Sequence, residues 1–177
     1  IDCGASTGGF TDVLLQNGAA KVYAVDVGYG QLAWKIRSDP RVVVMERTNI
    51  RYVTPEQLGE PLDLSVVDVS FISLKLVLPV IKTLLKPTGQ VLCLIKPQFE
   101  AGRADIGKRG VVKSAAAHER VLDGFCMMLE RNGLSLSGLI PSPVRGGDGN
   151  AEYLAAFSRE SSDFTPDIRA VVRSALA

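Results

Sequence analysis

The sequence has few of the residues that mark several large classes of protein. It contains three cysteines and one histidine in 177 residues. Three scattered cysteines give neither a disulfide framework nor a paired metal-ligand spacing, and one histidine argues against a histidine-based metal site, so we predict no metal. No apolar run approaches the roughly 20 residues that a membrane-spanning helix needs. These absences favour a reducing, cytoplasmic location, with Cys3, Cys93 and Cys126 packed as small hydrophobes.

The charge balance is close to neutral. Twenty Lys and Arg residues against 19 Asp and Glu residues give a net charge of +1. A nucleic-acid partner would therefore have to be held by a local basic patch or by a further domain. The length fits one domain with a sizeable core. Because the sequence begins at Ile1, in what reads as the middle of a strand, we expect that an N-terminal portion precedes it.

The first ten residues are the most informative stretch. An apolar residue and an acid come first, followed by small residues and then by a helical pattern. This order predicts a strand, a turn through Gly4, Gly8 and Gly9, and a helix over 9–16. Such a turn leaves backbone N–H groups free and directs the positive end of a helix dipole at a ligand. A turn chosen only for its geometry is the alternative, but the run of glycines favours a nucleotide-like ligand.

The rest of the chain alternates apolar strands with helices. We predict strands over 21–26, 42–45, 62–69, 91–95, 134–140 and 152–157, and helices over 31–37, 74–85, 114–131 and from 165 onward. A helical turn starts at 54–55, residues 87–89 form a turn, and 97–113 and 141–150 are loops. This order indicates an α/β fold with a mainly parallel sheet covered by helices on both faces. Ligands of such sheets bind at the carboxyl ends of the strands.

The choice of nucleotide stays open at this point. The glycine turn does not read G-x-G-x-x-G, and no G-x-x-x-x-G-K-[ST] occurs. Asp26 ends the second strand, where a carboxylate can accept both hydroxyls of a ribose, in NAD and in S-adenosylmethionine proteins alike. Asp26 could also simply cap the turn into Gly28-Tyr29-Gly30.

Several short motifs carry a more specific signal. The chain resembles FtsJ-like RNA methyltransferases of the TlyA type, which are often labelled haemolysins, up to about Phe157. The resemblance rests on motifs that occur in the family's order: DCGASTGGFT at 2–11, VDVGYGQL at 25–32, ERTN at 46–49, DVSFIS at 68–73, KPQFE at 96–100 and GNAEY at 149–153.

The resemblance implies the fold, the reaction and the catalytic residues. The expected fold is a Rossmann-like S-adenosylmethionine-dependent methyltransferase fold with a seven-stranded, mostly parallel sheet over 1–160, followed by a tail over 161–177 with a terminal helix. The implied reaction transfers a methyl group from S-adenosyl-L-methionine to a ribose 2′-oxygen of ribosomal RNA. Three members of a Lys-Asp-Lys-Glu tetrad fall on Asp68, Lys96 and Glu152. The first lysine and a small RNA-binding S4 domain would lie before Ile1.

These residue types suit the reaction. A ribose hydroxyl is a poor nucleophile, so a base must remove its proton as the methyl group arrives. An amine accepts a proton only in its neutral form, which burial or a neighbouring cation favours and carboxylates oppose. We predict that Lys96 is the base and that Asp68 and Glu152 orient it and the ribose. Taken singly, Lys96 could be a solvated lysine and Glu152 a surface acid.

The remaining site predictions concern the cofactor and the RNA. The glycine turn is assigned to the methionine end of the cofactor, Asp26 to its ribose, and Thr48 and Asn49 to its adenine, on which Tyr29 could pack. The full set of cofactor residues is Asp2, Gly4, Ala5, Ser6, Thr7, Gly8, Gly9, Phe10, Asp26, Val27, Tyr29, Thr48, Asn49 and Asp68. The predicted phosphate contacts, with a merely solvated charged loop as the alternative, are Arg103, Lys108, Arg109, Lys113 and Arg145.

Other functions remain as alternatives. A haemolysin-like, membrane-active protein should offer a long amphipathic or apolar segment, and the sequence has none. A non-catalytic module that binds cofactor and RNA would carry the same motifs. An NAD oxidoreductase is disfavoured by the glycine spacing. His118, near the start of an amphipathic helix, is predicted to be structural.

Overall fold

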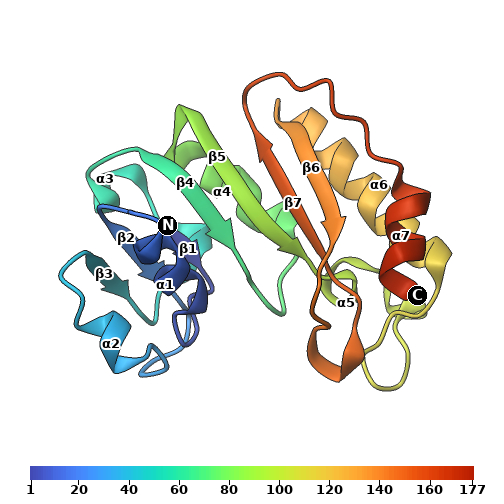
Figure 1. Ribbon diagram of the computed structural model, residues 1–177, viewed down its shortest axis with the longest axis horizontal. Helices are drawn as coiled ribbons and strands as arrows, with labels where there is room; N and C mark the ends of the chain where they lie inside the picture. The colour runs from blue at the N-terminus through green and yellow to red at the C-terminus, as the bar shows by residue number, and fades with distance from the viewer.

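The computed structural model describes residues 1–177 and is built around one seven-stranded sheet with the strand order β3-β2-β1-β4-β5-β7-β6 (Figure 1). The strands are β1 (Asp2–Cys3), β2 (Val22–Val25), β3 (Val42–Met45), β4 (Leu62–Val67), β5 (Leu85–Ile95), β6 (Ser135–Pro141) and β7 (Tyr153–Ser158). Neighbouring strands from β3 to β5 pair in parallel, and β7 is antiparallel to both β5 and β6. The predicted seven-stranded, mostly parallel sheet is confirmed.

Helices connect the strands. They are α1 (Gly9–Gln16), α2 (Trp34–Arg37), α3 (Pro55–Leu58), α4 (Leu74–Leu84), α5 (Pro97–Glu100), α6 (Ala115–Arg131) and α7 (Ile168–Leu176), with short 3₁₀ helices η1 (Ile50–Tyr52), η2 (Arg103–Asp105) and η3 (Gly147–Gly149). The predicted cap of α6 is present, because the Ser114 side chain accepts a hydrogen bond from the N–H of Ala117. Helix α2 begins three residues later than predicted, at Trp34 rather than Gln31.

The sheet buries side chains on both of its faces. Along β2, Val22 and Ala24 pack in a small core with Leu15 of α1 and Ile36 of α2. Tyr23 and Val25 point the other way into the main core, which α4 and α6 also line. Helix α7 packs beside α6 and contributes Val172 and Ala175 to this same core (Figure 1). Helices therefore cover both faces, as predicted.

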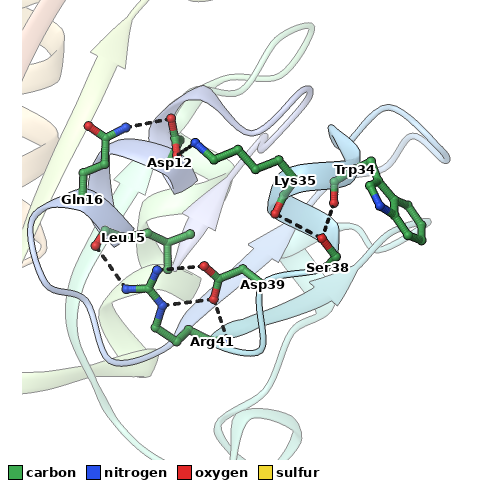
Figure 2. Close-up of polar contacts among 8 residues, drawn as sticks. All are labelled: Asp12, Leu15, Gln16, Trp34, Lys35, Ser38, Asp39 and Arg41. Carbon is green, nitrogen blue, oxygen red and sulfur yellow. Dashed lines mark hydrogen bonds and ion pairs between the residues drawn. The ribbon is translucent and has the colours of Figure 1, made fainter.

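Polar contacts fix α1 and α2 to the turn before β3 (Figure 2). The Arg41 guanidinium donates to the Asp39 carboxylate at 2.7 Å and to the carbonyl oxygen of Leu15 at 3.2 Å. Lys35 of α2 lies 3.6 Å from the Asp12 carboxylate on α1. These contacts join the middle and the end of α1 to α2 and to the turn before β3.

The inward face of α1 differs from the prediction. The apolar pattern predicts Phe10, Val13 and Leu14 on the buried face, but Val13 is 53% exposed. Thr11 is fully buried instead, because its hydroxyl donates a 2.7 Å hydrogen bond to the carboxylate of Asp2, the first residue of β1. This polar contact rotates the helix relative to its apolar pattern.

The turn predicted at 87–89 is also wrong, because these residues lie within β5. Leu62 of β4 pairs with Leu85, and Leu64 pairs with Gln90, so the register shifts between the two pairs. Such an irregularity accommodates Pro87, which has no N–H to donate to a regular ladder. No helix of the chain is both long and apolar enough to cross a membrane.

Candidate active site

A cavity of about 680 Å³ opens at the carboxyl ends of β1, β2 and β4, where the fold class predicts a ligand. Seven of the residues predicted to bind the cofactor line it: Gly4, Ser6, Asp26, Val27, Thr48, Asn49 and Asp68. Its other lining residues include Gln31 and Arg51 on one side and the segment 69–73 on the other. The volume is in the range that holds a nucleoside-sized ligand.

Close packing at Gly4 and hydrogen bonds at Asp26 shape the cavity wall. Gly4 has φ +85°, and a Cβ on it would lie 2.1 Å from the carbonyl oxygen of Asp68, so only glycine fits. Asp26 accepts hydrogen bonds from the N–H of Ser6 at 2.8 Å and from the N–H of Gly28 at 2.7 Å. Asp26 therefore caps the following turn, as the alternative interpretation has it, and also lines the cavity.

The other residues predicted for the cofactor do not line this cavity. They are Asp2, Ala5, Thr7, Gly8, Gly9, Phe10 and Tyr29. Asp2 is fully buried beneath the turn, and burial raises the pKa of its carboxyl above the ordinary value despite the hydrogen bond from Thr11. Gly8 packs against Leu32 and Ile36. Tyr29 lies under the guanidinium of Arg47, 4.3 Å from its ring centre.

A second cavity, of about 330 Å³, adjoins the first, and Ser70 and Phe71 line both. Lys96 and Glu152 line this second cavity together with Gln98, Phe99, Ile106, Arg109, Gly110, Gly147, Asp148 and Asn150. The predicted catalytic lysine and glutamate thus share one cavity, which borders the predicted cofactor cavity.

Lys96 makes direct contact with Asp68, because β4 and β5 are neighbouring parallel strands whose ends carry these two residues. Lys96 Nζ lies 2.5 Å from Asp68 Oδ1 and donates to the Ser70 hydroxyl at 3.1 Å. The Lys96 side chain is only 13% exposed. Two members of the predicted tetrad are therefore held together as a largely enclosed ion pair.

Glu152 lies opposite Lys96 on the next strand. Ile95 pairs with Tyr153 across β5 and β7, so Lys96 and Glu152 stand one residue beyond this last antiparallel pair. Glu152 is 6% exposed and accepts a 2.8 Å hydrogen bond from the Gln98 side-chain amide. A Cβ on Gly146 would lie 2.0 Å from the same oxygen, Glu152 Oε1. The alternative that Glu152 is a surface acid is thereby excluded.

An aromatic pair stands at the border of the two cavities. The Phe71 ring is 91% exposed and packs on Phe99 with ring centres 5.0 Å apart. Phe71 also has φ +62°, a conformation that bulky residues rarely adopt and that is found mostly at functional sites. Both residues lie inside the motifs at 68–73 and 96–100, but their sequence positions alone indicate no role.

The short helix α5 links these parts. Glu100, at its end, accepts hydrogen bonds from the Ser73 hydroxyl at 2.6 Å and from the N–H of Leu74 at 2.7 Å, at the start of α4. Burial raises the pKa of the Glu100 carboxyl. The stretch 96–100 therefore contacts Asp68, Glu152, Phe71 and the start of α4 through four of its side chains. The sequence predicted a loop here and missed Gln98 and Glu100.

Four of the five predicted phosphate contacts surround a third cavity. Lys108, Arg109, Lys113 and Arg145 line this cavity of about 680 Å³ together with Asp148. Arg109 and Asp148 also line the cavity of Glu152, so the two adjoin. Arg103 lies on η2 and lines neither cavity.

Buried polar side chains anchor the cationic loop. Asn150 accepts a hydrogen bond from the N–H of Val112 and donates to the carbonyl oxygens of Gly110 and Gly147, each at 3.1 Å. His118 is fully buried, with Nε2 2.9 Å from the Val112 carbonyl oxygen and Nδ1 2.7 Å from the Tyr153 hydroxyl. The prediction that His118 is structural is confirmed.

Comparison with known families agrees with this geometry. The family model described as "FtsJ-like methyltransferase" matches residues 1–159. The chain belongs to the FtsJ-like methyltransferase family. The fold is also that of a solved S-adenosylmethionine-dependent methyltransferase from Mesorhizobium loti, with a TM-score of 0.61, 13% identity and 88% of each chain covered.

Individual relatives are considerably more similar. YqxC of Bacillus subtilis, a candidate rRNA methyltransferase, is 56% identical over 87% of this chain and 55% of its own length. The 16S/23S rRNA (cytidine-2′-O)-methyltransferase TlyA of Mycobacterium tuberculosis is 49% identical over 86% of this chain and 57% of its own length. A candidate hemolysin of Streptococcus thermophilus has a solved structure with a TM-score of 0.93, 49% identity, and 98% of this chain and 64% of that chain covered. The chain thus spans about half the length of these two curated relatives.

Proposed function

We propose that this chain is the methyltransferase domain of an S-adenosylmethionine-dependent enzyme that methylates a ribose 2′-oxygen of ribosomal RNA. The observation that carries the proposal is the enclosed Lys96–Asp68 ion pair at the border between a nucleoside-sized cavity and the cavity of Glu152. Family membership and a relative named as an rRNA (cytidine-2′-O)-methyltransferase support the same reaction.

The residues of the first cavity fit the cofactor. Each Asp26 oxygen accepts one backbone N–H and keeps further lone pairs for a ribose hydroxyl. Thr48 and Asn49 would bind the adenine, and the turn from Gly4 to Ser6 would bind the methionine end next to Asp68. When bound there, S-adenosylmethionine supplies an electrophilic methyl group.

The chain's own residues would manage the proton of the ribose hydroxyl. Lys96 Nζ takes this proton once it is in the neutral amine form, and Asp68 fixes the direction of Nζ and stabilises the ammonium that results. Glu152, one residue beyond the last β5–β7 pair, orients the ribose from the other side. The low exposure of Lys96 and Glu152 limits competing hydrogen bonds with water.

The RNA would approach over the cationic loop. Lys108, Arg109, Lys113 and Arg145 provide phosphate contacts next to the Glu152 cavity. The exposed ring of Phe71, backed by Phe99, provides a platform on which an unstacked base can lie while its ribose faces Lys96. We therefore propose ribosomal RNA as the partner of the protein. We also propose a cytoplasmic location, because the ribosomal substrate is found there.

Domain limits follow from the same proposal. We assign residues 1–160 to the methyltransferase domain and 161–177 to a tail whose helix α7 packs on α6. The alternative is a protein that binds cofactor and RNA without catalysis. An experiment must distinguish this protein from an active methyltransferase.

The test is calorimetric titration with S-adenosylmethionine, with NAD as control, followed by methyl transfer to purified ribosomal subunits by the complete gene product. We expect binding of S-adenosylmethionine alone and a methyl group on a ribose 2′-oxygen. Cofactor binding without any transfer would overturn the enzymatic proposal. The variant Lys96→Met should bind the cofactor and lose transfer, and a normal rate in this variant would remove Lys96 as the base.

A further inference from the structure

We propose that Gln98 is a positioning residue that holds the Glu152 carboxylate in its working orientation. This inference rests on the proposed function, which gives Glu152 its role. The supporting observation is the 2.8 Å hydrogen bond from Gln98 Nε2 to Glu152 Oε1.

The surroundings of Glu152 make this contact decisive. The carboxylate is almost fully buried, and the Gln98 amide is the one hydrogen-bond donor that contacts it in the structure. Gly146 lies against the same oxygen, Oε1, without offering a side chain. A largely buried carboxylate that has one donor depends on that donor for its direction.

The Gln98 amide turns its nitrogen toward Glu152. This is the orientation in which the amide can donate to a carboxylate oxygen. The amide oxygen, Oε1, is then directed away from Glu152, and it is buried without a partner. An unpaired buried oxygen lowers stability, so this arrangement serves the Glu152 contact at a cost to the fold.

The backbone of α5 transmits this contact to the catalytic lysine. Gln98 is the second residue of α5, which begins immediately after Lys96 with Pro97 at its first position. The N–H of Phe99 donates to the carbonyl oxygen of Lys96 at 2.9 Å, closing this one turn. Glu100 anchors the end of the turn to α4. Gln98 therefore fixes Glu152 relative to Lys96 through one rigid turn.

The test compares Gln98→Met, which keeps the side-chain length and removes the donor, with Glu152→Gln and with the double variant, in the complete gene product. We expect Gln98→Met to lower kcat about 10- to 100-fold, as the loss of one hydrogen bond to a charged group does, and to leave the cofactor Kd unchanged. The loss should fall on kcat and leave KM for RNA at the parental value, because Glu152 stays in its cavity and loses only its fixed direction. In the Glu152→Gln background, Gln98→Met should change kcat by less than about threefold.

Gln16 provides a matched control. Its amide donates to the Asp12 carboxylate at the same distance, 2.8 Å, on the exposed surface of α1 (Figure 2). Gln16→Met should leave both kcat and KM for RNA at the parental values.

The outcomes separate this inference from the proposed function. A parental kcat in Gln98→Met, beside a strongly reduced kcat in Glu152→Gln, overturns the role of Gln98 alone. A parental rate in Glu152→Gln, or an inactive parent, overturns the role of Glu152 in the proposed function. In that case urea midpoints of the four proteins decide whether the contact exists: non-additive shifts support the Gln98–Glu152 coupling, and additive shifts overturn it.

Discussion

Replacing Gly146 by alanine places a methyl group where the Glu152 carboxylate lies. A Cβ on Gly146 would lie 2.0 Å from Glu152 Oε1 and 2.5 Å from its Cδ. Gly146 has φ −74° and ψ −174°, a conformation that alanine adopts without strain. The backbone of the loop can therefore accept the substitution, and the clash falls on the carboxylate.

The size of the effect follows from these distances. Non-bonded contacts of a Cβ closer than 3.0 Å are essentially never found, so Oε1 must move by at least about 1 Å. A displacement of this size breaks the 2.8 Å hydrogen bond with Gln98 unless Gln98 follows. Misplacing a catalytic group by about 1 Å costs on the order of 10²-fold in rate, which corresponds to about 2.7 kcal/mol of activation free energy.

The assay measures kcat and KM for transfer of a tritiated methyl group to ribosomal subunits, together with the cofactor Kd and the Tm. We expect a kcat loss of about 10²-fold with an unchanged Kd, because Gly146 does not line the cofactor cavity. Gly124→Ala in α6 is the control, since a Cβ there meets nothing within 4 Å. It should keep the parental kcat and raise stability by about 0.5–1 kcal/mol. A kcat of Gly146→Ala within about threefold of the parent refutes the reasoning.

Three further predictions concern the platform, the cationic loop and a buried acid. Phe71→Ala should raise KM for RNA and lower kcat, together about 10-fold or more in kcat/KM, because stacking contributes ~1–3 kcal/mol per base; an unchanged kcat/KM contradicts the platform. Asn150→Ala leaves the N–H of Val112 without its buried acceptor, so unfolding in urea should show a loss of about 1–3 kcal/mol and KM for RNA should rise; a parental urea midpoint contradicts this anchor. Burial raises the pKa of Asp2 above its ordinary value of 3.8. The stability that protonated Asp2 contributes is therefore fully present below pH 3.8 and is lost as the pH rises through the raised pKa of the folded state. The Tm of Asp2→Asn minus that of the parent should therefore increase between pH 4 and pH 8, and a difference independent of pH contradicts the assignment.

The sequence predicts the parts of the site that lie at strand ends. Asp26, Asp68 and Lys96 follow apolar strands, and parallel pairing brings the ends of such strands to one edge. The resemblance adds the roles of Asp68, Lys96 and Glu152. Secondary structure follows where local signals agree with tertiary packing, as at the Ser114 cap of α6.

Contacts between segments far apart in the chain lie beyond such reasoning. The Gln98–Glu152 bond joins residues 54 positions apart and depends on α5, which has no periodicity to reveal it. Thr11 turns inward because it bonds to Asp2, against the apolar pattern of α1. Pro87 lies within β5, in the irregularity between the Leu62–Leu85 and Leu64–Gln90 pairs, and only pairing with a distant strand reveals this.

Methyl transfer by the complete gene product and by its Lys96→Met variant tests the central claim most directly. Both proteins are incubated with tritiated S-adenosylmethionine and purified ribosomal subunits, and the modified nucleotide is identified after digestion of the RNA. We predict a labelled ribose 2′-O-methyl nucleotide with the parent and none with Lys96→Met, although both bind the cofactor equally. Label on a base instead of a ribose, or equal label from the two proteins, contradicts the account.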